Sequence, residues 1–89
     1  LQDLGQLAPA EKAYRQAVFL NPRHFGSLTN LAALLLTRAQ QSESSDETRK
    51  LLVEARRLVQ QSLVINPAQP RAPQILRLVS DLLDASGGA

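Results

Sequence analysis

The 89-residue chain contains no cysteine, methionine or tryptophan, and only 3% of its residues are aromatic. The lack of cysteine excludes a disulfide framework, a thiol nucleophile and a zinc site built on thiolates. The aromatic residues are Tyr14, Phe19 and Phe25, so leucine, valine, isoleucine and alanine must supply the core. Leucine and alanine are good helix formers, and this composition therefore favours a helical protein.

The chain also has no strong excess of charge of either sign. Ten Lys and Arg residues and eight Asp and Glu residues give a formal net charge of +2. Such a small excess does not by itself indicate a nucleic-acid partner. The longest apolar run, from Leu31 to Leu36, is far shorter than the roughly 20 residues that a membrane-spanning helix needs. No signal peptide or other targeting segment is recognised.

The chain does not begin with methionine, and Leu1 is too bulky for routine removal of an initiator methionine to have exposed it. We therefore expect the sequence to be a segment of a longer protein. Its length fits one small domain, and a domain of this size is only marginally stable unless its core is efficient or is shared with other surfaces.

Two Asn-Pro pairs, Asn21-Pro22 and Asn66-Pro67, each follow an apolar run with helical spacing. Because proline cannot continue the preceding helix, each pair predicts a helix end. Apolar residues three and four apart predict a helix over about 9–20, with Pro9 at its first position. The apolar stripe of this helix consists of Leu7, Ala10, Tyr14, Ala17 and Val18.

The same spacing predicts three more helices, over about 25–39, over about 46–65, and from Pro73 to the Gly87-Gly88 pair. Gly26, near the start of the first of these, predicts close approach of another backbone. The helix over about 25–39 has the inner stripe Leu28, Leu31, Ala32, Leu35 and Leu36. The helix over about 46–65 has Leu51, Leu52, Ala55, Leu58, Val59, Ser62 and Leu63, and the last helix has Ile75, Leu76, Val79, Leu82 and Leu83. No stretch alternates with the period of a strand, so the predicted fold class is all-α.

Polar residues fill the segment from Gln41 to Asp46, which predicts a loop. Ser44 followed by Glu47 is a capping-box pattern, worth about 1 kcal/mol when formed. Glu47 and Glu54 stand three or four residues from several cations, so ion pairs within the third predicted helix are expected. At that spacing stand Lys50 and Arg57, and the other two cations of this helix are Arg49 and Arg56.

The first predicted helix resembles the second half of a tetratricopeptide repeat. That repeat has glycine, a large residue, alanine, an aromatic residue, alanine, an aliphatic residue and proline at the offsets found here. The matching residues are Gly5, Leu7, Ala10, Tyr14, Ala17, Leu20 and Pro22. The residues that resemble the first helix of the next repeat are Leu28, Asn30, Leu31, Ala32 and Leu35. Those that resemble its second helix are Ala55, Val59, Ser62, Ile65 and Pro67.

The distance between the two repeat prolines departs from the standard array. Pro22 and Pro67 stand 45 positions apart, whereas the repeat period is about 34. The surplus is close to three helical turns of about 3.6 residues, so the hairpin can lengthen and keep its facing stripes. We expect it to be partly a loop over about 40–49 and partly extended helix.

The resemblance implies a superhelix of about four helices in antiparallel hairpins, forming the C-terminal part of a solenoid. Residues 5–22 correspond to the second half of a repeat, 23–67 to a complete repeat with the inserted loop, and 70–85 to a helix that closes the array.

The family's first helices line a concave groove that binds peptides or partner helices, so the resemblance implies noncatalytic protein–protein interaction without a cofactor. The groove would hold Thr29, Asn30, Ala33, Thr37, Arg71, Gln74 and Leu78. Some members clamp the carboxylate of chaperone tails, and Asn30 and Arg71 match clamp positions whereas Ile75 replaces a needed cation. A hydrogen bond between helices is an equally open role for Asn30.

No group of residues predicts catalysis or metal binding. His24 is the only histidine and has no triad or metal partner at useful spacing, so a solvent-facing turn residue is expected. Asp81 and Asp84 are expected to form a solvated face. The cations of the third predicted helix are also assigned to a solvated face, because no aromatic residue lies among them for base stacking.

Two other roles remain open beside a binding module. The chain can be an architectural segment of a large assembly, with its groove filled by its own chain or by a neighbour. It can also be a regulatory or targeting appendage of an enzyme whose catalytic domain lies upstream.

Overall fold

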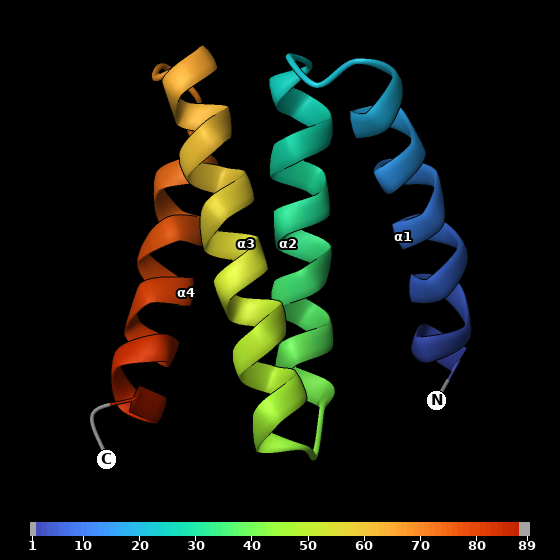
Figure 1. Cartoon of the computed structure of the whole chain (residues 1–89), viewed down its shortest axis with the longest axis vertical. Helices are drawn as coiled ribbons and strands as arrows, with labels where there is room; N and C mark the ends of the chain where they lie inside the picture. The colour runs from blue at the N-terminus through green and yellow to red at the C-terminus, as the bar shows by residue number, and fades with distance from the viewer. Residues whose placement is uncertain (1, 88–89) are drawn as a thin grey trace.

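The computed structural model describes residues 2–87, with side chains described for residues 8–85. This part of the chain forms four helices in consecutive antiparallel order (Figure 1). The helices are α1 (Gln2–Leu20), α2 (Phe25–Gln41), α3 (Ser45–Ile65) and α4 (Ala72–Gly87). The described residues contain no strand, so the predicted all-α class is confirmed.

The helix ends lie close to their predicted positions, with one exception at the start of α1. Both helices that precede an Asn-Pro pair end where predicted, at Leu20 and Ile65. Pro9, however, lies inside α1 instead of at its first position, so that prediction is wrong. Proline removes a single backbone donor, and the leucine, glutamine and alanine residues around it are good helix formers, so the helix continues upstream. The side chain of Leu7 lies outside the described residues.

The α2–α3 hairpin is longer than a standard repeat, and nearly all of its additional residues are helical. Since α2 extends to Gln41 and α3 begins at Ser45, only Ser42, Glu43 and Ser44 connect them, a much shorter loop than the predicted 40–49. Ser44 caps α3, because its Oγ accepts from the backbone N–H of Glu47 at 3.3 Å. The reciprocal part of the capping box is replaced, since the N–H of Ser44 donates to Ser42 Oγ at 3.2 Å.

The core lies between α2, α3 and α4, and all of its residues except Ala39 and Ala72 belong to the three predicted inner stripes. The buried core cluster consists of Leu28, Leu31, Ala32, Leu35, Leu36 and Ala39 of α2, Leu51, Leu52, Ala55, Leu58 and Val59 of α3, and Ala72, Ile75, Val79 and Leu83 of α4. The predicted stripe residues Leu63, Leu76 and Leu82 are half-buried against this cluster. α2 is central, because it packs against α1, α3 and α4.

α1 is held less deeply than the other helices. Its residues from Ala8 to Leu20 include none that is fully buried, and Tyr14 and Val18 pack half-buried against the core. In Figure 1 it lies on the far side of α2 from α4. None of the helices described is long and apolar enough to cross a membrane.

The start of α2 is capped by His24. Its Nδ1 accepts from the backbone N–H of Ser27 at 3.0 Å, and the exposed ring stacks on Phe25. A Cβ at Gly26 would lie 3.2 Å from Cε1 of His24. Gly26 therefore makes room for the capping ring, and the predicted close approach of another backbone is wrong.

Candidate binding groove between α2 and α4

Of the residues predicted to line a groove, Thr29, Asn30 and Arg71 lie together in a hollow between the start of α2 and the turn before α4. Ala33 and Thr37 of α2 and Gln74 and Leu78 of α4 line neither this hollow nor the one near the other end of these helices. On α2, Gly26, Asn30, Ala33, Thr37 and Gln40 follow one another at spacings of three or four, so they share one face. Arg71 immediately precedes α4, and one face of α4 then carries Gln74, Leu78, Leu82 and Ala85. We refer to the surface between these two faces as the α2/α4 groove.

A hollow of about 190 Å³ with a mixed polar and apolar lining lies at one end of the groove. Arg71 Nη1 donates to Asn30 Oδ1 at 3.4 Å across the junction of the two helices. The hollow is lined by Phe25, Gly26, Thr29, Asn30, Gln69, Pro70 and Arg71. The guanidinium of Arg71 is exposed and the amide of Asn30 is half-buried, so both side chains remain accessible to a ligand.

Thr29 differs from its predicted role, because its hydroxyl is used inside the protein. The residue is 5% exposed, and its Oγ1 donates to Gln69 Oε1 at 2.7 Å and lies 2.6 Å from Ser62 Oγ. Thr29 therefore lines the hollow beside Asn30 and Arg71 but offers no free hydroxyl to a ligand.

Gln69 ties the turn before α4 to α3. Its Nε2 lies 2.7 Å from Ser62 Oγ, 3.1 Å from the carbonyl oxygen of Ser62 and 3.0 Å from that of Asn66. The single hydroxyl proton of Ser62 faces two acceptors, Thr29 Oγ1 and the carbonyl oxygen of Phe25. Every buried side-chain nitrogen and oxygen of the described residues has a partner. The sequence reasoning missed Gln69, for which the only signal is a polar residue in the turn between Pro67 and Pro70.

Replacing Gln69 with alanine is expected to lower the free energy of unfolding by about 1 to 2 kcal/mol, because Ser62 and Thr29 lose buried hydrogen bonds. Urea unfolding followed by circular dichroism measures this change. Gln61→Ala is the matched control, since Gln61 is exposed on α3, and its effect should stay within about 0.5 kcal/mol. Equal midpoints for the two variants would show that Gln69 does not hold the turn.

An apolar hollow of about 330 Å³ lies at the other end of the groove. It is lined by Ala39, Gln40, Thr48, Leu52, Leu82 and Ala85, which come from α2, α3 and α4. Leu78 lies on α4 between the two hollows and is 49% exposed. The groove therefore offers hydrogen-bonding groups at one end and apolar surface at the other. Sequence reasoning missed the apolar hollow because its lining comes from three separate helices.

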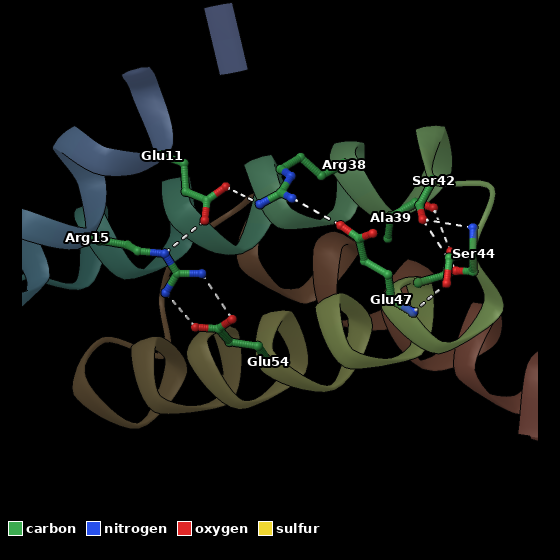
Figure 2. Close-up of polar contacts among 9 residues, drawn as sticks. Glu11, Arg15, Arg38, Ala39, Ser42, Ser44, Glu47 and Glu54 are labelled. Carbon is green, nitrogen blue, oxygen red and sulfur yellow. Dashed lines mark hydrogen bonds and ion pairs between the residues drawn. The ribbon is translucent and has the colours of Figure 1, made fainter. Parts of the chain in front are cut away.

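Charged residues on the other side of α2 connect α1 to α2 and α3 (Figure 2). Arg15 Nη1 and Nη2 donate to the two oxygens of Glu54 at 2.7 and 3.1 Å, and Arg15 Nε donates to Glu11 at 2.9 Å. Arg38 bonds to Glu11 on one side and to Glu47 at 3.2 Å on the other. Glu47 and Glu54 thus pair with cations of α2 and α1, and the predicted pairing within α3 is wrong.

The contact with Arg15 changes the titration of both partners. The hydrogen bonds from Arg15 lower the pKa of Glu54, against the opposing effect of burial. The same bonds raise the pKa of Arg15. The pKa of Glu54 is lower in the folded chain than in the unfolded chain. The pair therefore stabilises the fold fully at pH values above the unfolded-state pKa, and this stabilisation is lost as the pH falls through the folded-state pKa and Glu54 becomes protonated.

The other predicted candidates lie on the surface. Asp81 and Asp84 are exposed, as a solvated face requires, and Arg49, Lys50 and Arg57 are exposed on α3. The described residues contain no group of three or more His, Asp or Glu side chains placed to hold a metal ion.

Comparisons with known proteins returned no matching family model, curated protein or solved structure.

Proposed function

We propose that this chain is a tetratricopeptide-like segment that binds an extended peptide or a partner helix of another protein in the α2/α4 groove, without catalysis. One observation carries the proposal, namely that two hollows of different polarity stand at the ends of a single line of accessible residues. An extended chain laid along this line meets hydrogen-bonding groups first and apolar surface afterwards. Sites with that combination supply both affinity and direction to a bound peptide.

The order and packing of the helices support the repeat assignment. The proposed complete repeat is the α2–α3 hairpin, and its small repeat positions Ala32 and Ala55 are fully buried. Leu31 is buried beside them, and Pro22 and Pro67 lie in the exposed turns that follow α1 and α3. Ala10, Tyr14 and Ala17 of the proposed half repeat are half-buried. In this assignment α4 closes the array.

Exposed aromatic and aliphatic side chains at the end of α1 favour a second candidate role. Phe19 and Leu20 are 81% and 73% exposed, an unusual state for large apolar residues next to each other. A neighbouring subunit or segment covering them would make the chain an architectural part of a larger assembly. A role as an enzyme appendage has no observation of this kind behind it.

The groove is tested by selecting binders from a library of random peptides roughly ten residues long. α4 has 16 residues, so its length of about 24 Å matches about seven extended residues. We expect Leu78→Asp to weaken binding of the selected peptides at least about tenfold, because it places a charge in the middle of the groove. Ala13→Asp is the control, since Ala13 is exposed on α1 and outside the groove.

Two results would contradict the proposal. One is a selection that yields no peptide with measurable affinity for the folded chain. The other is a set of peptides that bind the Leu78→Asp and Ala13→Asp variants equally well. Because both positions are exposed, circular dichroism should show the same helix content in both variants.

A further inference from the structure

The side of α3 opposite its buried residues carries cations and valines in a regular arrangement. Val53 is 43% exposed, and its four neighbours on the helix surface, three and four residues before and after it, are all cations. Val64 continues the same line and is 84% exposed. We call this surface the α3 outer face, and it consists of Arg49, Lys50, Val53, Arg56, Arg57, Gln60 and Val64.

Two of the three α3 carboxylates near these cations are engaged by other helices, and the third, Asp46, forms no salt bridge with them. Glu54 lies within four residues of Lys50 and Arg57 but is engaged by Arg15 of α1, and Glu47 is engaged by Arg38 of α2. Within the described part of the chain, none of the four cations around Val53 forms a salt bridge. The ion pairs that attach α1 therefore leave four positive charges within about 12 Å along α3.

We propose that the α3 outer face is a second docking surface, distinct from the α2/α4 groove, and that its partner is an acidic amphipathic helix of another protein. An apolar residue surrounded by four cations is complementary to an apolar residue surrounded by four carboxylates. A helix presents that pattern when glutamate or aspartate stands three and four residues on both sides of a leucine. The arginines can bind such carboxylates with two hydrogen bonds each.

The composition of the face favours a protein partner over other anionic partners. Its apolar residues are two valines, too small an apolar surface to anchor a helix in a lipid interface. It carries no aromatic residue on which a nucleic-acid base can stack. A carboxylate-rich helix needs neither, since opposite charge steers the encounter and Val53 supplies the apolar contact.

The probe is a synthetic helical peptide with a central leucine and glutamate at the four surrounding positions, compared with a scrambled peptide of the same composition. Fluorescence anisotropy should show at least about tenfold tighter binding of the ordered peptide, with an affinity that falls as salt is added. Arg49→Gln/Arg57→Gln should weaken this binding at least about tenfold. Lys12→Gln/Arg77→Gln removes the same net charge at two other exposed positions and should change it less than about twofold.

The Val53→Ser variant distinguishes binding that needs the apolar contact of Val53 from binding by charge attraction alone. It keeps all four cations and should weaken binding of the ordered peptide several-fold, while binding of polyglutamate stays unchanged. Leu78→Asp, which tests the groove, should leave this binding unchanged, so the two proposals fail separately.

Three results would overturn the inference. The first is equal affinity for the ordered and scrambled peptides. The second is equal loss of affinity in the two double variants. The third is tighter binding of duplex RNA or of vesicles containing anionic lipid than of the ordered peptide, because the surface would then serve a different class of partner.

Discussion

Replacing Leu31 with alanine is expected to lower the free energy of unfolding by about 2 to 4 kcal/mol. Leu31 is 2% exposed within the core cluster, in the central helix α2. The substitution removes three carbon atoms from a packed site and leaves a cavity that the surrounding helices can fill only partly. A urea midpoint measured by circular dichroism reports this loss, with an unchanged slope if the unfolded state is unaffected.

Val64→Ala is the matched control for Leu31→Ala, since Val64 is 84% exposed. Its effect should stay within about 0.5 kcal/mol. If both variants unfold at the wild-type midpoint, Leu31 does not face the core and the inner stripe of α2 has been assigned to the wrong side.

Replacing Ala55 with leucine is expected to cost about 1 to 3 kcal/mol, although leucine is a good helix former. Ala55 is fully buried in α3 within the core cluster. A larger side chain there must push α3 away from its neighbours or adopt a strained rotamer. The urea midpoint again measures the effect.

Ala13→Leu makes the same chemical change at an exposed position of α1. It should leave the midpoint within the equivalent of about 0.5 kcal/mol. An Ala55→Leu variant as stable as Ala13→Leu would mean that α3 does not pack closely at Ala55, contrary to the structure.

Features that depend on neighbouring residues along the chain could be predicted from the sequence. The ends of α1 and α3 follow from Pro22 and Pro67, because proline acts on the residues next to it. The buried stripes follow from the 3.6-residue period, which assigns each apolar residue to a face whatever its partner is.

Features that depend on the direction of a side chain between helices could not be predicted. Thr29 has the right spacing for the groove, but it turns inward to Ser62, which is 33 residues away in the sequence. Glu54 stands within four residues of Lys50 and Arg57 of its own helix, yet it forms a bidentate contact with Arg15 of α1. Two parallel hydrogen bonds of this kind are stronger than a single ion pair along the helix. The capping role of His24 was missed because histidine is not among the preferred N-cap residues.

α2, α3 and α4 pack side by side around one core, with α4 touching both of the others. Methyl groups of Leu35, Val59 and Val79 are fully buried in that core, one from each helix. A methyl nuclear Overhauser spectrum of the folded chain tests this most directly. Contacts are expected between methyl groups of α2 and α3, of α3 and α4, and of α2 and α4. A spectrum showing only contacts within single helices would contradict this packing.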